Sequence, residues 1–217
     1  MKTRAFDLLV PTRCAGCGAV GEPCCADCAA VWDSLTEVAR GPTVGLAPVY
    51  ALAAYRGVAR RLVIAYKERG RRDLAPSLGS ALARAVPSMP GPPGEPVWLV
   101  PVPSKASVSR MRGGAHMARL ARWCARALGE QGLRADVAPA LRLDPEVRDA
   151  VGLRSGERAA NLAGKVRLRE RGRPPPGARV IVLDDVITSG STAAACVRVL
   201  ALGGMHVAAV LTLTAAG

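Results

Sequence analysis

The sequence predicts an α/β protein, in which helices cover both faces of a parallel β-sheet, preceded by a small cysteine-rich module. Two observations carry this prediction. From about residue 48 onward, short apolar segments alternate with helix-like segments, which is typical of parallel strands buried on both faces. In contrast, five of the seven cysteines fall between positions 14 and 28. We therefore expect two units, a zinc-binding module with a helix in residues 1–40 and an α/β domain in residues 41–217.

Hydrophobic periodicity places the elements in order along the chain. Strands are expected at residues 48–55, 97–103, 136–143, 179–185 and 205–214. Helices are expected at residues 25–39, 57–69, 73–85, 115–132, 153–162 and 191–204. Asp73 can cap the third of these helices, and Gly132 can end the fourth. The Pro- and Gly-rich segments 87–96 and 173–178 predict irregular connections.

Composition excludes some classes of protein. No run of 18 apolar residues exists, so we expect no membrane span, and the apolar stretch at the start is too short for a secretory signal. We expect a cytoplasmic protein. The net charge of +13 favours a polyanionic partner such as nucleic acid, although only seven aromatic residues are available for base stacking. The alternative is a bias of composition, because nearly all basic residues are arginines spread along the chain.

The cysteine spacing predicts a structural zinc site. Cys14-x2-Cys17 and Cys25-x2-Cys28 can each supply two thiolates, and four cysteines close a tetrahedral coordination sphere. Cys24 is an alternative ligand to Cys25. A reducing compartment favours metal over disulfides, and a redox dithiol and unliganded thiols remain as alternatives. Because this segment has few apolar side chains, zinc would supply its folding free energy.

The segment VIVLDDVITSGST, residues 180–192, carries the main functional signal. An apolar strand is expected to end at Leu183, before Asp184 and Asp185, and small hydroxyl residues then lead to a helix that begins near Ser191. Ligands of parallel α/β sheets bind beyond the carboxyl ends of the strands. There, hydroxyls, free N–H groups and the helix dipole together favour an anion, most naturally phosphate.

The predicted phosphate-binding residues are the five small residues of the turn: Thr188, Ser189, Gly190, Ser191 and Thr192. The segment is not a Walker A loop, because the Gly-Lys-Ser/Thr element is missing. Two carboxylates would repel a bare phosphate, so the ligand should also offer hydroxyl donors or bring a cation. A ribose 5-phosphate offers vicinal hydroxyls at one end and a phosphate at the other. For both aspartates to serve one ligand, the chain must leave strand geometry at Asp184. The alternative is a capped turn with no ligand.

VLDDVITSGST resembles the phosphoribosyl-pyrophosphate (PRPP) motif of type I phosphoribosyltransferases. The resemblance implies that Asp184 and Asp185 contact the ribose 2′- and 3′-hydroxyls, and that residues 188–192 hold the 5′-phosphate. With the cysteine module in front, nearly the whole chain resembles the ComF family, which includes competence-associated and GntX-like proteins. The other matching segments are LLVPTRCAGC, YKERGRRDLAPSLGSALA, VPVPSKASVSRMRGG and GLRSGERAANLAG.

The resemblance implies a type I phosphoribosyltransferase-like domain with a zinc-ribbon-like module. It implies a transferase that binds PRPP with Mg²⁺ and passes ribose 5-phosphate to an unidentified acceptor, with release of pyrophosphate. The implied setting is DNA uptake, as in competence, or the use of DNA-derived nucleobases. The alternative is a non-catalytic part of a DNA-uptake machinery, which binds single-stranded DNA or a competence helicase. PRPP would then be a regulatory ligand, or its site a vestige.

The basic loop after the VPVP strand supplies candidates for binding the leaving group. Lys105, Arg110 and Arg112 can neutralise pyrophosphate together with Mg²⁺, or they can form a solvated basic loop. The family usually has an Arg-Gly-Phe-Asn-Gln run here, whereas this chain reads RGGAH and ends the run on His116. A glutamine that is common before the Gly-Leu-Ser run is replaced by Ala150. Both departures lie where acceptor or pyrophosphate would bind.

Some polar residues have two interpretations. Lys67, near a helix end, either complements the helix dipole or contacts the ligand. Arg158 and Asn161 either face the site or cap and solvate a short helix. His116 is expected to be a packing or surface residue, with ligand contact as the alternative. The other histidine and the two cysteines outside the cluster are expected to be structural: His206, Cys124 and Cys196.

Overall fold

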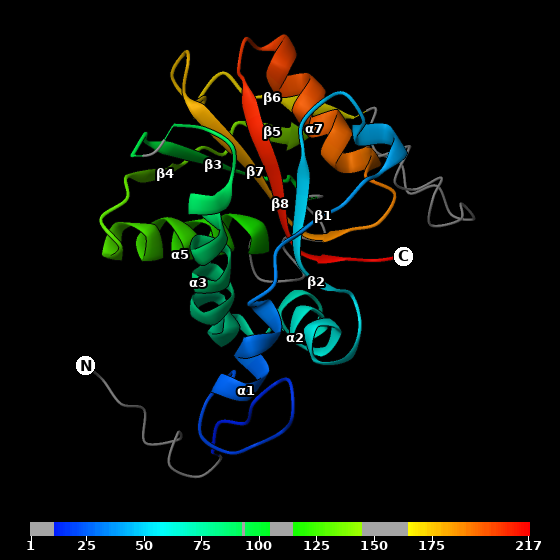
Figure 1. The fold of residues 1–217 in the computed structure, drawn as a ribbon, viewed down its shortest axis with the longest axis vertical. Coiled ribbons are helices and arrows are strands. Elements are labelled where there is room, and N and C mark those ends of the chain that lie inside the picture. Colours follow the sequence, from blue (N-terminus) through cyan, green and yellow to red (C-terminus); the bar gives the residue numbers. More distant parts are fainter. Residues whose placement is uncertain (1–10, 93, 105–114, 145–164) are drawn as a thin grey trace.

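The structure is a computed structural model that describes residues 11–92, 94–104, 115–144 and 165–217. Its main sheet has the strand order β1-β2-β8-β7-β3-β4 (Figure 1). The strands are β1 (Thr36–Glu37), β2 (Val49–Ala54), β3 (Val97–Pro101), β4 (Ala135–Val137), β7 (Arg179–Ile187) and β8 (Val207–Ala215). Every neighbouring pair is parallel except β1 with β2. The prediction of an α/β fold with a parallel sheet is confirmed.

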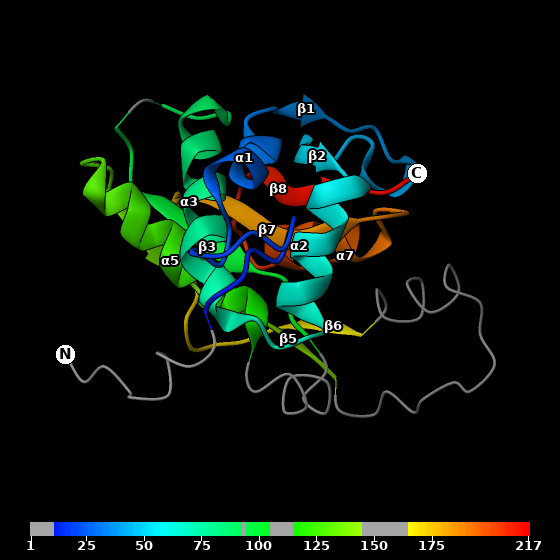
Figure 2. The ribbon, with the colours of Figure 1, turned by 90° about the horizontal axis from the view of Figure 1, so that it is seen from below.

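Helices cover both faces of the sheet (Figures 1 and 2). They are α2 (Gly57–Lys67), α3 (Ala75–Ala85), α5 (His116–Glu130) and α7 (Ser191–Leu202). On β7, Ile181 and Leu183 pack into the core beneath α2, α3 and α5, whereas Val180 and Val182 pack into the core beneath α7. Successive side chains of a strand point to opposite faces. The position of a residue along β7 therefore decides which helices it meets.

The N-terminal segment contains less helix than its sequence predicts. The helix expected at residues 25–39 is limited to α1 (Ala26–Ala29) and the 3-10 turn η2 (Ala30–Trp32). The chain then becomes extended, because Ser34 Oγ donates a hydrogen bond to the carbonyl of Leu52 and β1 pairs with β2. A second 3-10 turn, η3 (Gly41–Thr43), lies in the connection to β2.

Two further expectations are corrected. Asp73 does not cap α3, because it lies in the 3-10 turn η4 (Arg72–Leu74) and its carboxylate accepts hydrogen bonds from Arg71. The strand expected at residues 136–143 is divided into β4 and β5 (Leu141–Leu143). β5 leaves the main sheet and pairs with β6 (Val166–Leu168) in an antiparallel ribbon.

The cysteine-rich segment packs on the α/β part. Cys14, Cys28 and Trp32 are buried in the same hydrophobic core as Leu62 of α2 and Leu78 of α3. Arg61 Nε of α2 also donates a hydrogen bond to the carbonyl of Gly16. Figure 1 shows this segment against α2 and α3, away from α7. It therefore shares a core with the larger part of the chain.

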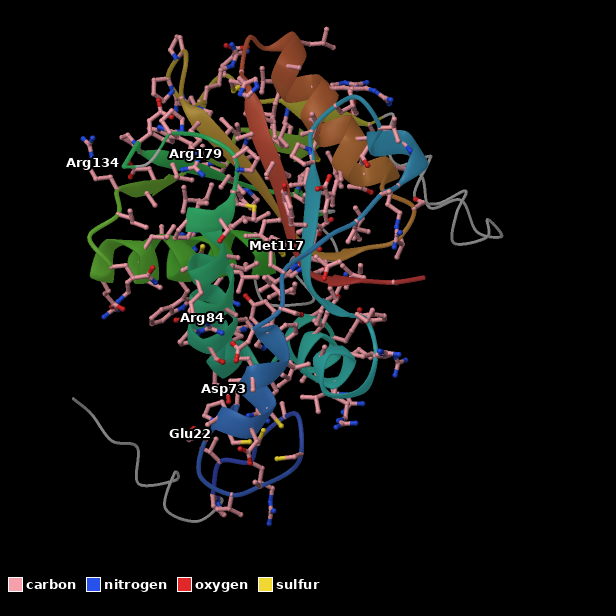
Figure 3. The ribbon with its side chains drawn as sticks, viewed as in Figure 1. Glu22, Asp73, Arg84, Met117, Arg134 and Arg179 are labelled. Carbon is pink, nitrogen blue, oxygen red and sulfur yellow. The ribbon has the colours of Figure 1, made fainter. Side chains whose placement is uncertain are left out.

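At the amino end of β7, Arg179 fixes the Pro- and Gly-rich connection that precedes β3. Its guanidinium donates to the carbonyls of Met89 at 2.6 Å and Pro90 at 2.9 Å, close to the turn η5 (Val86–Ser88). Figure 3 shows Arg179 at the end of the sheet remote from Asp73 and Glu22. The start of β7 is thus held by buried polar contacts. In the part of the chain that the structure describes, no helix is long and apolar enough to cross a bilayer.

Candidate functional site

The acidic pair lies within β7 and not after it. β7 continues to Ile187, and both Val186 and Ile187 remain paired with β8. The expectations that the strand ends at Leu183 and that the chain leaves strand geometry at Asp184 are both wrong, because these two β-branched residues extend the ladder. Asp184 and Asp185 keep strand geometry, and their side chains therefore lie on opposite faces of the sheet.

Asp184 lies on the α7 side, in a small hollow with a volume of about 30 Å³. The remaining lining comes from residues 186–193. Gly190 is the N-cap of α7 and has a φ of +82°, a left-handed conformation that glycine adopts without steric cost. The hollow thus brings together Asp184 and the five residues predicted to hold phosphate: Thr188, Ser189, Gly190, Ser191 and Thr192.

Asp185 lies on the other face, where its side chain is enclosed between α2 and α5. Only 3% of the residue is exposed. Lys67 Nζ lies 2.8 Å from Asp185 Oδ1, and His116 Nε2 lies 2.8 Å from Asp185 Oδ2. Tyr66 Oη donates to the backbone carbonyl of His116 at 2.7 Å, and the two rings meet edge to face. Lys67 therefore does more than complement a helix dipole. His116 is buried, as expected of a packing residue, and also contacts the acidic pair.

The two carboxyl groups ionise differently. Burial, and then the negative charge of Asp185, raise the pKa of Asp184 to about 7. Burial also acts to raise the pKa of Asp185, but the hydrogen bond with His116 and the charge of Lys67 outweigh burial and lower that pKa to about 2. Asp185 is consequently an ionised acceptor at neutral pH, whereas Asp184 gains or loses a proton near neutrality.

Arg40 connects the end of the N-terminal segment to the hydroxyl-rich turn. Its Nε donates to the carbonyl of Thr188 at 2.6 Å, and its Nη2 donates to the carbonyl of Ala216 at 2.7 Å. A Cβ atom at Gly190 would lie 2.8 Å from Arg40 Cβ, so this contact also requires a glycine. No motif in the sequence marks Arg40, because its partner Thr188 lies 148 positions away.

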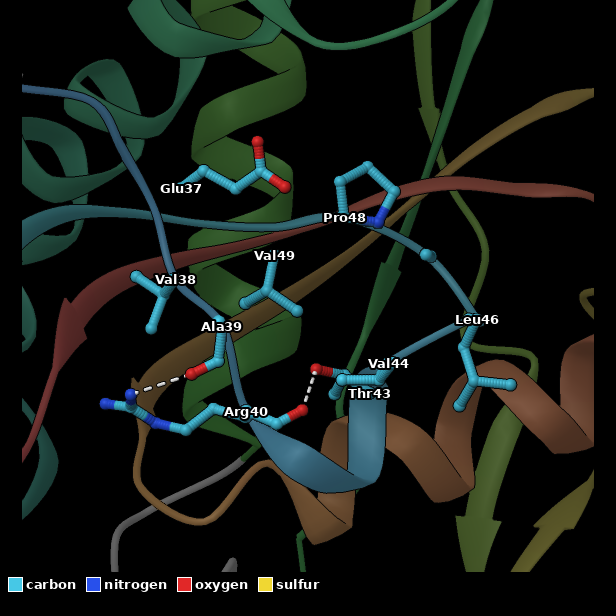
Figure 4. Close-up of a pocket in the computed structure, with 11 residues that line it drawn as sticks. Glu37, Val38, Ala39, Arg40, Thr43, Val44, Leu46, Pro48 and Val49 are labelled. Atoms are coloured by element: carbon cyan, nitrogen blue, oxygen red, sulfur yellow. Dashed lines mark hydrogen bonds between the residues drawn. The ribbon is translucent and has the colours of Figure 1, made fainter.

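Figure 4 shows the connection that carries Arg40. Thr43 Oγ1 donates to the backbone carbonyl of Arg40, and Arg40 Nη1 donates to the carbonyl of Ala39. A cavity of about 380 Å³ is lined by residues 37–49 alone. This cavity includes neither aspartate, and it offers a mainly apolar wall. The small hollow beside α7, and not the larger cavity, therefore holds the predicted phosphate-binding residues.

The cysteine cluster brings four sulfur atoms close enough together to hold one metal ion. The sulfur atoms of Cys14, Cys17, Cys25 and Cys28 all lie within 4.8 Å of one another. Zn–S bonds of about 2.3 Å in a tetrahedron place sulfur atoms about 3.8 Å apart, and Cys17 Sγ and Cys25 Sγ are 3.6 Å apart. Cys24 is not part of the cluster in the described residues. In Figure 3, sulfur atoms gather close to Glu22.

The backbone around this cluster is suited to thiolate ligands. Burial acts to raise the pKa of Cys14, but N–H groups that include those of Cys25 and Gly16 outweigh burial and lower that pKa to about 6. Both of these N–H groups lie 3.4 Å from Cys14 Sγ. A Cβ atom at Gly16 would lie 2.6 Å from Cys28 Sγ, so only glycine leaves room for the fourth sulfur. The donor set fits Zn²⁺.

Several predicted site residues lie outside the described residues: Lys105, Arg110, Arg112, Arg158 and Asn161. Cys124 and Cys196 are buried within α5 and α7, as expected of structural residues. His206 is exposed just before β8.

Comparisons with known proteins find similarity in solved structures only. No family model matches the sequence, and no curated protein matches it. An asparagine mutant of an HPRT, studied for an invariant aspartic acid, is 16% identical, with a TM-score of 0.35 and 67% of this chain covered. This chain spans 65% of that chain, slightly less than two thirds. Hypoxanthine-guanine phosphoribosyl transferase of L. donovani is 17% identical, with a TM-score of 0.37, and the match covers 66% of this chain and 71% of that one. Adenine phosphoribosyltransferase of Saccharomyces cerevisiae is 16% identical, with a TM-score of 0.33 and coverage of 88% and 89%.

Proposed function

We propose that the chain binds PRPP with Mg²⁺ at the carboxyl end of β7 and transfers ribose 5-phosphate to an acceptor, with release of pyrophosphate. The observation that carries this proposal is the hollow that joins Asp184 to residues 188–192 at the N-terminus of α7. A helix N-terminus presents N–H groups and a positive dipole to a phosphate. The carboxylate beside it accepts hydrogen bonds from ribose hydroxyls. The likeness of VLDDVITSGST to the PRPP motif supports the same assignment.

In the proposed reaction, the bond between the ribose anomeric carbon and pyrophosphate breaks, and pyrophosphate leaves with the electron pair. A nucleophilic atom of the acceptor forms the new bond at that carbon. The transition state resembles an oxocarbenium ion, so the protein has to position the ribose and stabilise charge more than it has to supply a strong base. Asp184 would hold ribose hydroxyls from the hollow and Asp185 would do so from the opposite face of β7, while Lys105, Arg110 and Arg112 would face the leaving group. Bound Mg²⁺ would neutralise part of the pyrophosphate charge.

We also infer that the four clustered cysteines hold a structural Zn²⁺. Four thiolates close the coordination sphere and leave no open position for a substrate. The support is the proximity of their sulfur atoms together with the N–H groups directed at Cys14.

Calorimetric titration of PRPP, with and without Mg²⁺, tests the proposed site. We expect the zinc-loaded protein to bind PRPP in the micromolar range, and an Asp184→Asn/Asp185→Asn variant to lose binding. Thr188→Ala should weaken binding by about 1.5–3 kcal/mol, the range for a hydrogen bond to a charged group. Thr36→Ala makes the same change on exposed β1 and should leave the dissociation constant unchanged. Unaltered affinity in the double variant, or no binding by the wild type, would refute the proposal.

The net charge of +13 favours a second candidate function, binding of single-stranded DNA. Arg56, Arg60 and Arg61 are exposed at the start of α2 and add to this charge. DNA binding should weaken steeply with salt, because each phosphate contact releases counterions. A titration with an oligonucleotide at several salt concentrations tests this. The role in DNA uptake and the helicase partner depend on the resemblance to ComF alone.

A further inference from the structure

Two residues from two helices contact the carboxylate of Asp185, and a third supports one of them. Lys67 closes α2 and reaches Oδ1, while His116 opens α5 and reaches Oδ2, each at 2.8 Å. Tyr66 precedes Lys67 and fixes the backbone of His116 through its hydroxyl. We call Tyr66, Lys67 and His116 the Asp185 clamp. Each carboxylate oxygen is thus held by a side chain from a different helix.

The clamp leaves the carboxylate able to bind more donors. Each oxygen of an ionised carboxylate accepts about two hydrogen bonds, and the clamp occupies one on each oxygen. Among the described residues, these two contacts leave one acceptor position on each oxygen of Asp185. Two acceptor positions on a fixed carboxylate suit a diol, and vicinal hydroxyls are the feature of a ribose that a carboxylate recognises.

The imidazole of His116 is buried and makes its hydrogen bond with Asp185 through Nε2. The residue is 5% exposed, and its Nδ1 has no hydrogen-bond partner within the described part of the chain. A buried polar atom without a partner is costly, so the ring is retained at a cost in stability. Its hydrogen bond with Asp185 is the contact that offsets this cost.

Stability alone does not account for the arrangement. A buried ion pair is weak evidence for stability, because apolar residues of similar size are often at least as stabilising at such positions. The preceding residue on this face of β7 is apolar, since Leu183 packs into the core beneath α2, α3 and α5. A charged group next to this core, held by Lys67 and His116 near the carboxyl end of the strand, fits a functional role better than a packing role.

We propose that His116 is a positioning residue, which acts through Asp185 to hold this carboxylate in the orientation that binds the ribose hydroxyls of PRPP. The proposal rests on the proposed function of the site. His116 does not touch the ligand in this assignment. It acts by fixing the oxygen that the ligand meets, and Tyr66 acts one step further back by fixing His116.

PRPP titrations of four proteins test the role of His116: the wild type, His116→Ala, His116→Gln and His206→Ala. We expect His116→Ala to weaken PRPP binding roughly 10- to 100-fold, as for a lost hydrogen bond to a charged group. The glutamine amide can donate to the same oxygen, so His116→Gln should bind within about threefold of the wild type. His206 is the exposed histidine and serves as the control. Thermal unfolding shows that each variant is folded.

A second readout needs no ligand. The side-chain ¹³C carboxyl signal of Asp185, identified by its absence in Asp185→Asn, is followed against pH in the wild type and in His116→Ala. We expect the signal to titrate at a clearly higher pH in His116→Ala, because the carboxylate has lost a donor. This shift establishes that His116 acts on Asp185, and the difference in PRPP affinity between His116→Ala and His116→Gln then separates positioning from a merely structural role.

The outcomes separate the two proposals. If the wild type binds no PRPP, the proposed function fails. If the wild type binds PRPP and folded His116→Ala binds equally well, the function stands and the positioning role fails. Equal losses of PRPP affinity in His116→Ala and in folded His116→Gln also overturn the positioning role, because a donor at this position would then not restore binding. An Asp185 titration that is identical in both proteins overturns it whether or not PRPP binds.

Discussion

The side chain of Asp184 lies in the hollow beside α7, while that of Asp185 lies between α2 and α5. Lys67 and His116 are both on the Asp185 side, so among the described residues only Asp185 has close donors from side chains. The other carboxyl accepts a hydrogen bond from the N–H of Asp185 at 2.8 Å. Because strand geometry places the two aspartates in different surroundings, the pKa of Asp184 is raised and the pKa of Asp185 is lowered.

This difference predicts how Asp184→Asn alters stability with pH. The pKa of Asp184 is raised in the folded state, from 3.8 to about 7, by burial and by the charge of Asp185. Its ionisation therefore opposes folding: the penalty is absent below pH 3.8, grows up to about pH 7 and is complete above it. Asparagine stays neutral and keeps the acceptor for the N–H of Asp185. We expect Asp184→Asn to raise the melting temperature at pH 8 and to leave it unchanged at pH 4.

Melting curves of wild type and variant from pH 4 to pH 8 measure this difference. Asp136→Asn removes a charge from an exposed position on β4 and is the matched control. A melting temperature that Asp184→Asn raises equally at pH 4 and pH 8 would contradict a raised pKa for Asp184.

At the scale of elements, the turn between β7 and α7 is supported from outside. Arg40, at the end of the N-terminal segment, binds the carbonyl of Thr188 and lies against Gly190. Gly190 has a φ of +82° and no room for a side chain on the Arg40 side. The shape of the hollow therefore depends on a segment that belongs to the first 40 residues.

Gly190→Ala should destabilise the protein for two reasons. The left-handed conformation costs an alanine about 1–2 kcal/mol, and the new Cβ would lie 2.8 Å from Arg40 Cβ. Gly45→Ala separates these reasons, because Gly45 has a φ of +74° and nothing within 4 Å of a Cβ. We expect Gly190→Ala to lower the free energy of unfolding, measured in urea, by clearly more than Gly45→Ala does. Equal losses would mean that the contact with Arg40 adds nothing.

The helices and strands differ in how well the sequence alone predicts them. Apolar periodicity predicted β2, β8, α2, α5 and α7, because each has a continuous pattern of its own. The end of β7 was missed, because Val186 and Ile187 join the strand only through pairing with β8. The role of Asp73 was missed for a similar reason, since its carboxylate pairs with Arg71 and not with a helix end.

The candidate site was predicted in part. Asp184 and residues 188–192 are contiguous, so their meeting in one hollow could be predicted from the sequence. The contacts of Lys67 and His116 with Asp185 span 118 and 69 residues, and they depend on how α2 and α5 pack on the sheet. One signal was present in the sequence: each of these residues is polar and lies at a helix end next to a segment that resembles the PRPP-binding family.

At the scale of the whole molecule, the cysteine cluster and the sheet are connected through one core. Cys14, Cys28 and Trp32 are buried together with residues of α2, α3 and β8. β1 extends from this segment into the sheet, and Arg40 then reaches the hydroxyl-rich turn. The folding of the cysteine segment, and the binding of a metal to it, are therefore coupled to the stability of the α/β part of the chain.

This connection predicts the effect of removing the proposed zinc. If the cluster and the sheet share a core, then losing the metal should destabilise the entire chain and not the N-terminal segment alone. We expect Cys28→Ser to lose bound zinc and to lower the melting temperature of a single calorimetric transition. The apparent binding free energy of structural zinc in zinc-finger peptides is about 10–16 kcal/mol, so the decrease should be large. Metal content is measured by mass spectrometry on the same samples.

Cys24→Ser is the matched control for this experiment. Cys24 is buried beside the cluster, but its sulfur is not one of the four that come together. The variant should retain zinc, and its smaller loss of stability should reflect packing alone. Two separate transitions, with the larger one unaffected by loss of zinc, would show instead that residues 1–40 fold apart from the sheet. In that case the contact of Arg40 with the turn could not transmit the state of the cluster to the site, and the hollow should keep its affinity for PRPP in the zinc-free protein.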